Sequence, residues 1–184
     1  SLDMSTMPKS PFTDVVAGSW YFDAALYASS HNLMLGTSPT EFSPNITMTR
    51  GMLVTVLYRM NGSPSVSGKT PFTDVRTDEW YSAAVLWAYQ NGIVTGMSDT
   101  TFAPINNVTR EQMATILFRY TKTAAPDKAK ASADLSGFAD AGSVNDWAVD
   151  AMRWAVGQKL IAGITLEQSV YLQPRGNATR AQAA

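Results

Sequence analysis

Apolar residues recur at helical spacing in three places along this chain of 184 residues. Tryptophan, alanine and a further aromatic residue stand there at i, i+4, i+7 and i+8, which puts them on one face of a helix. The three sets are Trp20, Ala24, Tyr27 and Ala28, then Trp80, Ala84, Trp87 and Ala88, then Trp147, Ala151, Trp154 and Ala155. The pattern predicts three equivalent helices, each beginning near its first tryptophan. We expect their Trp/Ala faces to be buried and to pack around a shared axis.

A second helix is predicted in each copy from its N-cap and its apolar face. The expected starts are Thr49, Thr109 and Thr179, because a threonine hydroxyl can accept a bond from an unpaired backbone N–H. Gln112 and Gln182 complete capping boxes three residues later, whereas Met52 does not. The expected buried positions are Leu53, Val56, Leu57 and Met60 in the first copy, and Met113, Ile116, Leu117 and Tyr120 in the second.

The segment around these helices is itself repeated. Ten positions between Phe12 and Arg50 recur 60 residues later, between Phe72 and Arg110, without an insertion. A third, looser copy begins at Phe138, and its offset from the second copy grows from 66 there to 70 at Pro174. A fixed long period marks a repeat architecture, and one short repeat buries too little apolar surface to be stable alone. We therefore expect an all-α fold of three helix–loop–helix repeats with a shared helical core.

The connecting segments are rich in Ser, Gly, Pro, Lys and Ala, a composition typical of exposed linkers. The predicted division is a linker at 1–11, a repeat at 12–62, a linker at 63–71, a repeat at 72–122, a linker at 123–137 and a repeat at 138–184 with a truncated last helix. The opening segment lacks the pattern of a signal peptide. No apolar run approaches the roughly 20 residues that a membrane-spanning helix needs. We expect a piece of a longer protein.

Composition excludes several classes of chemistry. The net charge of −1 gives no broad attraction to nucleic acid or to acidic membranes, so neither is an expected partner. The absence of cysteine rules out disulfides, thiolate catalysis and cysteine-bound metals. The single histidine, His31, is replaced by Asn91 and Gln158 in the other copies. No paired catalytic carboxylates or run of calcium ligands is present. We expect no enzyme activity, no cofactor and no metal.

An arginine stands one residue after the capping threonine in every copy, at Arg50, Arg110 and Arg180. The partial positive charge of a helix N-terminus disfavours a cation there. Three arginines at this position therefore suggest a role such as gripping a carboxylate or phosphate with the planar guanidinium. The alternative is a structural salt bridge from each arginine to an aspartate of a repeat.

Two further residue types have both a structural and a functional interpretation. Asp14, Asp74 and Asp140 each follow a phenylalanine by two positions, and each is either a turn or cap residue or a ligand contact. Trp20, Trp80 and Trp147 are core residues by their spacing. An indole edge exposed beside an arginine would instead suit a sugar ring, because aromatic faces pack against sugar C–H surfaces.

A long loop with a glycine and an apolar anchor before proline joins the two helices of each copy. The glycines are Gly36, Gly96 and Gly163, and the anchors are Phe42-Ser43-Pro44, Phe102-Ala103-Pro104 and Leu172-Gln173-Pro174. The order Phe-x-Asp-Val, Trp, Gly, Phe-x-Pro and Thr-Arg resembles the S-layer homology domain in three tandem copies, and the likeness covers the chain after Pro11. The second loop, from Gly96 to Phe102, fits the family best.

The resemblance implies a pseudo-threefold α-helical spindle outside a bacterial cell, at its surface. It also implies binding of a secondary cell-wall polymer, with a pyruvylated sugar, often a ketal of N-acetylmannosamine, in grooves between neighbouring repeats. The contact residues would then be Asp14, Asp74, Asp140, Trp20, Trp80, Trp147, Arg50, Arg110, Arg180 and the loop Gly96. A passenger domain would be fused to the module in the full-length protein.

Some positions depart from the family pattern, in which Thr-Arg is followed by Ala-Glu. Gly51 and Met52 take these places in the first copy, and the third loop lacks the Asp and Phe of the second. The second repeat is therefore expected to contribute most to binding. Two alternatives to wall anchoring are protein–protein assembly in a surface array and the targeting domain of a wall-acting glycan hydrolase.

Overall fold

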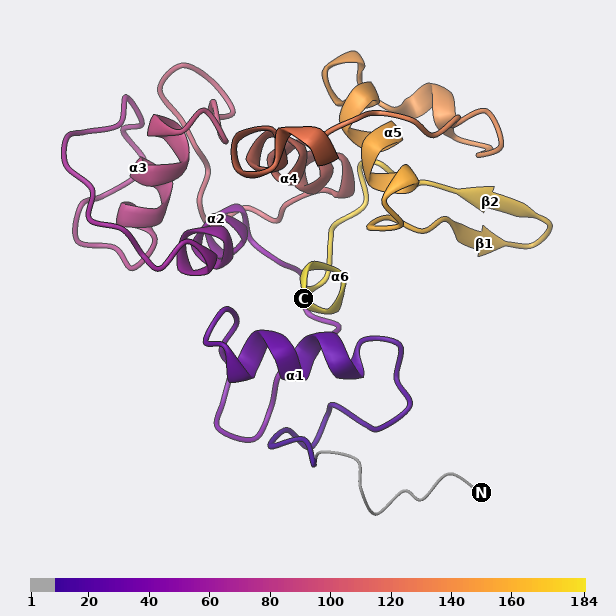
Figure 1. Cartoon of the computed structure of the whole chain (residues 1–184), viewed down its shortest axis with the longest axis horizontal. Coiled ribbons are helices and arrows are strands. Elements are labelled where there is room, and N and C mark those ends of the chain that lie inside the picture. The colour runs from indigo at the N-terminus through magenta and orange to yellow at the C-terminus, as the bar shows by residue number, and fades with distance from the viewer. Residues whose placement is uncertain (1–8) are drawn as a thin grey trace. The chain divides into compact units, whose positions relative to one another are not determined.

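The computed structural model describes residues 9–184 (Figure 1). Most of the predicted first linker, 1–11, therefore lies outside the described residues. The chain divides into two compact units, a smaller one of residues 1–46 with 179–184 and a larger one of residues 47–178.

Both units consist of short helices joined by long ordered loops. The smaller unit holds α1 (Phe22–Ser30) and α6 (Arg180–Ala183). The larger unit holds α2 (Arg50–Met60), α3 (Ser82–Gln90), α4 (Arg110–Ala124), α5 (Val149–Gly157), the short 3-10 helices η2 (Pro126–Lys128), η3 (Ala141–Ser143) and η4 (Asp146–Ala148), and the strands β1 (Ile164–Leu166) and β2 (Ser169–Tyr171). The two strands form an antiparallel hairpin in which Thr165 pairs with Val170.

The expectation of an all-α fold is wrong. About 38% of the structure is helical, and the third loop contains a β-hairpin, visible beside α5 in Figure 1. The hairpin lies where the third copy has its extra residues. The remaining loop backbone is held by hydrogen bonds to side chains and to other loops rather than by helices. Apolar periodicity detects helices but not loops ordered in this way.

The predicted N-caps are confirmed. The hydroxyls of Thr49, Thr109 and Thr179 each accept a bond from the backbone N–H three residues later. Complete capping boxes form with Gln112 and Gln182. The threonines therefore fix the start of each second helix, and with it the position of the arginine that follows.

The residues immediately before these threonines are joined by a closed cycle of hydrogen bonds inside the larger unit. The N–H of Met48 donates to the carbonyl of Ala178 (2.8 Å), that of Ala178 to Val108 (2.9 Å), and that of Val108 to Met48 (2.8 Å). All three residues are fully buried. The cycle satisfies backbone groups that burial would otherwise leave unpaired.

The helices of different repeats pack against one another. Within the larger unit, α2 packs on α3 and α4 packs on α5. The second helix of one repeat thus contacts the first helix of the next. The Trp/Ala faces of α3 and α5 are buried as predicted, at Ala84, Trp87, Ala88, Ala151, Trp154 and Ala155.

The expectation that the leading tryptophans are core residues is wrong. Trp20, Trp80 and Trp147 are 73%, 58% and 54% exposed. The α-helices begin two residues after each of them, so the tryptophans lie outside the helical phase that buries the later positions. Tyr27 and Met60, also expected in the core, are exposed as well.

Candidate functional site

The aspartate that recurs in each repeat accepts hydrogen bonds from the backbone of a loop. The carboxylate of Asp74 accepts hydrogen bonds from the N–H groups of Phe102 (2.9 Å) and Ala103 (2.7 Å). The equivalent bonds run from Phe42 and Ser43 to Asp14 and from Leu172 and Gln173 to Asp140. Both oxygens of each carboxylate are thus engaged, as the turn or cap interpretation expects.

The three arginines bond the carbonyl groups of the same loops. The Nε of Arg50 donates to the carbonyl of Phe102 (2.8 Å), and its guanidinium lies over the Phe102 ring, 4.7 Å from the centroid. The Nε atoms of Arg110 and Arg180 donate to the carbonyls of Leu172 and Phe42. These bonds do not include Asp14, Asp74 or Asp140, so the structural role is a backbone clamp and not the salt bridge that the sequence offers as the alternative to ligand binding.

The first N–H groups of α2 are also engaged. The N–H of Arg50 donates to Asn106 (2.9 Å) and that of Gly51 to Pro104 (2.8 Å), while Met52 donates to the cap hydroxyl of Thr49. Carbonyl groups facing the helix N-terminus offset the unfavourable position of the arginine. The guanidinium, and not the helix end, is therefore the donor available to an anion.

Arg50 differs from its two counterparts in what its terminal nitrogens do. Arg110 donates from Nη2 to the carbonyl of Ala162 (2.8 Å), and Arg180 donates from Nη2 to Leu35. The Nη atoms of Arg50 form no hydrogen bond to any residue that the structure describes, although the side chain is only 5% exposed. The Nη donors of Arg50 are therefore free, whereas Arg110 and Arg180 each use an Nη donor in a hydrogen bond to a backbone carbonyl.

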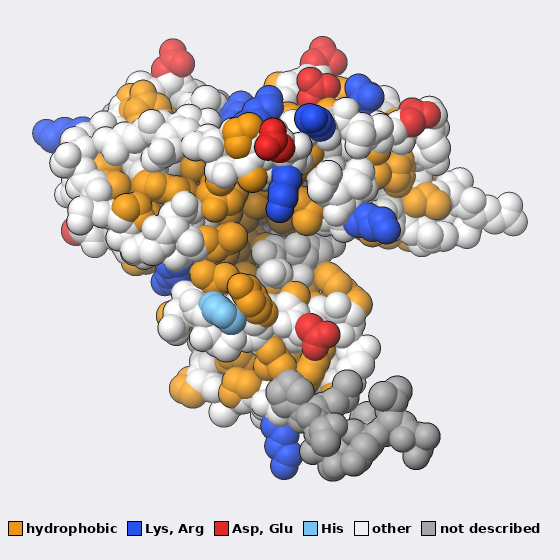
Figure 2. All heavy atoms as spheres, viewed as in Figure 1, with side chains coloured by type: hydrophobic (Ala, Val, Ile, Leu, Met, Phe, Trp, Pro, Cys, Tyr) orange, Lys and Arg blue, Asp and Glu red, His pale blue; other side chains and the backbone are white. Residues whose placement is uncertain are grey.

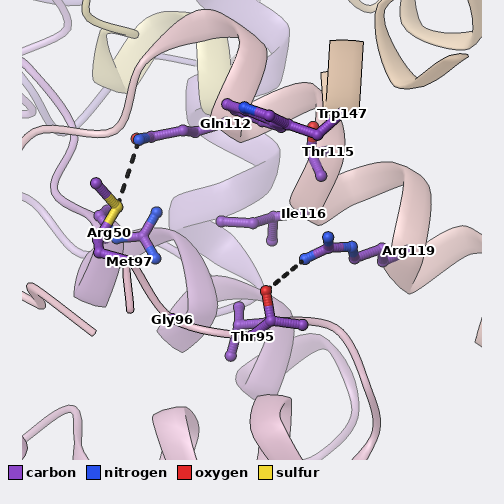
Figure 3. A pocket seen from close by; sticks show the side chains of 10 residues that line it. Arg50, Thr95, Gly96, Met97, Gln112, Thr115, Ile116, Arg119 and Trp147 are labelled. Carbon is purple, nitrogen blue, oxygen red and sulfur yellow. Dashed lines mark hydrogen bonds between the residues drawn. The ribbon is translucent and has the colours of Figure 1, made fainter. Parts of the chain in front are cut away.

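Arg50 opens onto a groove of about 350 Å³ in the larger unit. Its walls come from α2, α4, the second loop and η4, and the lining residues are Arg50, Val94, Thr95, Gly96, Met97, Gln112, Thr115, Ile116, Arg119 and Trp147. Figure 3 shows Arg50 beside Met97 and Arg119 on another side, next to Thr95. The volume is in the range of small-molecule clefts, which begin at about 300 Å³.

The groove is positively charged. Burial lowers the pKa of the Arg50 guanidinium to about 10, with Asp74 raising it and the charge of Arg119 lowering it further. Burial also lowers the pKa of Arg119. The lining residues include no carboxylate, so two partly desolvated cations share the space without a counter-ion from the walls.

Gly96 brings the second loop close to the groove. Its φ is +88°, a conformation that favours glycine. A Cβ there would lie 2.5 Å from the ring of Phe72 and 2.5 Å from the carbonyl of Ser98. Only glycine fits this position, so the loop can run directly over the Phe72 ring.

Three of the predicted site residues lie together in the structure. The others cap loops, bond loop carbonyls or lie exposed elsewhere. Arg50, Gly96 and Trp147 line the groove, whereas the three aspartates cap loops. Trp20 and Trp80 are exposed and meet Tyr21 and Tyr81 edge-on, with ring centroids 5.3 and 5.1 Å apart. Arg110 and Arg180 act as loop clamps and do not line this groove.

Sequence reasoning missed the contribution of α4. Gln112, Thr115 and Arg119 face the groove from three successive turns of that helix. A signal was available, because Arg59 stands 60 positions before Arg119 and repeats the same residue at the same helical position. The sequence predictions for α4 cover its cap and its apolar face, which includes Ile116, but not the polar residues that face the groove.

Residues 9–184 show no metal site and no membrane-spanning helix. In this part of the chain, no three His, Asp or Glu residues gather where they could hold a metal ion. The helices of the same part are too short or too polar to span a bilayer.

Comparison with known proteins agrees with the three-copy pattern. The S-layer homology domain matches residues 11–51, 71–114 and 137–184. The chain belongs to the S-layer homology domain family. S-layer homology domains are binding modules of surface proteins, and the family points to the cell surface.

Relatives include both enzymes and surface-layer proteins. An endoglucanase of Bacillus sp. (strain KSM-635) is 34% identical over 95% of this chain and 18% of its own length. An amylopullulanase of Thermoanaerobacterium thermosulfurigenes is 29% identical over 94% of this chain and 9% of its own. The surface-layer 125 kDa protein of Lysinibacillus sphaericus is 32% identical over 79% of this chain and 12% of its own. The chain therefore spans less than a fifth of these proteins.

Proposed function

We propose that this S-layer homology module anchors a larger protein to the bacterial cell wall by binding a pyruvylated polysaccharide, without catalysis. The binding site is the groove lined by Arg50, Gly96 and Trp147. One observation carries the proposal: Arg50 is almost wholly buried, yet its Nη donors are free and open onto the groove.

The charge of the groove favours an anion of the size of one sugar unit. A guanidinium with two free nitrogens suits a carboxylate, because the planar group can donate two parallel hydrogen bonds. A pyruvate ketal supplies such a carboxylate on a sugar ring. On the face seen in Figure 2, basic and acidic side chains are interspersed over the larger unit. With a net charge of −1 the chain has no overall positive charge, so selectivity for an anion would come from the groove.

Trp147 supplies the surface for the sugar ring. Its side chain is half exposed and lines the same groove as Arg50. An indole face packs against the C–H groups of a sugar, and the ring N–H adds direction. The arginine would select the pyruvyl group, while the tryptophan would hold the ring that carries it.

The remaining assignments complete the proposal. The repeats are the segments 12–62, 72–122 and 138–184, and a passenger domain lies elsewhere in the full-length protein. Asp14, Asp74, Asp140, Arg110 and Arg180 support binding by ordering the loops. Trp20 and Trp80 offer further sugar-binding surfaces, since both rings are exposed.

The direct test is calorimetric titration of a pyruvylated N-acetylmannosamine disaccharide, and of the same disaccharide after chemical removal of pyruvate. We expect the wild type to bind only the first. Hydrogen bonds to a charged group contribute about 1.5–3 kcal/mol, so Arg50→Gln should weaken binding by about tenfold to a hundredfold. Arg50→Lys should recover part of the loss, because it keeps the charge but not the fork.

Arg175→Gln is the matched control. Arg175 is exposed and does not line the groove, so its replacement removes the same charge from the surface and should leave the affinity unchanged. Circular dichroism would verify that each variant is folded. Equal binding of both disaccharides by the wild type, or undiminished binding by folded Arg50→Gln, would overturn the proposal.

A further inference from the structure

The groove holds a second arginine that the repeat motif does not include. Arg119 lies on α4, nine residues after the clamp arginine Arg110 and therefore on a later turn. It lines the same groove as Arg50, which comes from α2. Figure 3 shows the two guanidiniums approaching the cavity from different sides, with Ile116 between them in that view.

Most of the N–H donors of the Arg119 guanidinium are unused. Among the residues that the structure describes, this guanidinium forms one hydrogen bond, from Nη1 to the hydroxyl of Thr95, at 3.4 Å. This distance is at the long end for a hydrogen bond. A guanidinium carries five N–H donors, so most of those on Arg119 are open to solvent or to a ligand.

The two arginines carry like charges, and the residues that line the groove between them include no carboxylate. Burial lowers the pKa of Arg50 most, Asp74 outside the groove lining raises it, and the charge of Arg119 lowers it by less than Asp74 raises it. Like charges in a partly desolvated site are unfavourable, and a bound anion relieves the repulsion. One carboxylate at Arg50 neutralises one of the two charges and leaves the other.

We propose that Arg119 is a second ligand-binding residue, which takes a second oxyanion on the sugar next to the pyruvylated one. The groove would thus recognise a doubly anionic stretch of polymer, with the ketal carboxylate at Arg50 and a phosphate or carboxylate at Arg119. This inference rests on the proposed function, since it assigns a second subsite in the same groove.

Three synthetic disaccharides test the second subsite. All carry the pyruvate ketal on one sugar, and the neighbouring sugar is neutral, phosphorylated or a uronic acid. We expect the wild type to prefer one charged disaccharide over the neutral one by about tenfold or more, the effect of one hydrogen-bonded charge. The preferred disaccharide identifies the oxyanion as phosphate or as carboxylate.

The variants assign the preference to Arg119. Arg119→Gln should reduce it to less than about twofold while changing the affinity for the neutral-neighbour disaccharide little, and Arg119→Lys should keep part of it. Lys122→Gln is the control, because Lys122 lies on the same helix over the ring of Phe118 and does not line the groove. It should retain the full preference.

The outcomes separate this inference from the proposed function. Equal binding of all three disaccharides by the wild type, or a preference that survives in folded Arg119→Gln, would overturn the second subsite. If binding in that case still required pyruvate and Arg50, the proposed function would stand. A wild type that bound none of the three would overturn both.

Discussion

Both carboxylate oxygens of Glu111 accept hydrogen bonds from Asn145. The backbone N–H of Asn145 donates to Oε2 (3.0 Å), and its side-chain amide donates to Oε1 (2.6 Å). Glu111 is only 2% exposed and comes from α4, while Asn145 is the N-cap residue of η4, two positions before Trp147. The pair thus fixes the segment that carries the groove tryptophan to the helix that forms another wall.

Replacing Glu111 should therefore affect both stability and binding. Glu111→Ala leaves two donors of Asn145 unpaired, and we expect the free energy of unfolding to fall by about 1.5–3 kcal/mol. The affinity for a pyruvylated disaccharide should also fall, because η4 would no longer hold Trp147 in place. Denaturant unfolding and calorimetry measure the two effects.

The control for this variant is Asp127→Ala, which removes an exposed acidic residue in η2. It should change neither quantity by more than the usual surface effect of about 0.5 kcal/mol. Lost stability with full binding in Glu111→Ala would show that the pair supports the fold without positioning Trp147.

The aspartate cap of the second loop can be tested in the same way. Asp74→Ala removes the acceptor for two N–H groups, one of them on the fully buried Phe102. An unsatisfied buried donor costs about 1–3 kcal/mol, so we expect a clear loss of thermal stability. Hydrogen exchange should show faster opening of the second loop than of the helices. Asp99→Ala, an exposed substitution in the same loop, should leave this exchange unchanged. Unaltered protection in Asp74→Ala would contradict the cap role.

Sequence predicted the parts of the fold that depend on local chemistry. The threonine caps, both capping boxes and the buried faces of α3 and α5 follow from neighbouring residues, and the structure confirms them. The exposure of Trp80 was not predictable from spacing alone. A periodic pattern does not reveal that the helix begins at Ser82, two residues after Trp80, and this difference decides whether the Trp80 ring is buried or exposed.

The sequence predicted which residue types form the candidate site, but not which groups each arginine bonds. The sequence predicts that the arginine after the cap is a ligand residue or a salt-bridge partner, and the structure adds a third role, a hydrogen bond to a loop carbonyl. Which arginine keeps free donors depends on distant contacts, those of Arg110 with Ala162 across 52 positions and of Arg180 with Leu35 across 145 positions. Neither local propensity nor repeat alignment contains this information, because the three arginines are equivalent in sequence.

The close approach at Gly96 gives a stability prediction with an internal control. Gly96→Ala would place a Cβ 2.5 Å from the Phe72 ring in a backbone conformation with φ of +88°. Overpacking and strain of this kind cost about 1–3 kcal/mol each, so we expect a lower melting temperature and a weakened groove. Gly142→Ala has no neighbour within 4 Å and should be close to neutral. Equal melting temperatures for both variants would show that the second loop can relax around Gly96.

The lowered pKa of Arg50 predicts how binding depends on pH. The charged guanidinium attracts the carboxylate, and its pKa in the free groove is about 10 because burial outweighs the opposing effect of Asp74, with a further lowering by the charge of Arg119. Affinity should therefore be constant through neutral pH and fall as the pH rises through about 10, where an ordinary arginine would remain charged. A bound anion raises the pKa of Arg50, so binding near that pH should take up protons, and calorimetry in buffers of different ionisation enthalpy would detect this.

Two variants serve as controls for the pH dependence. Arg119→Gln removes the neighbouring charge and should move the fall in affinity to higher pH, whereas Lys122→Gln should not. With folding verified by circular dichroism at each pH, an affinity that stays constant to pH 11 would exclude Arg50 as the group that holds the anion.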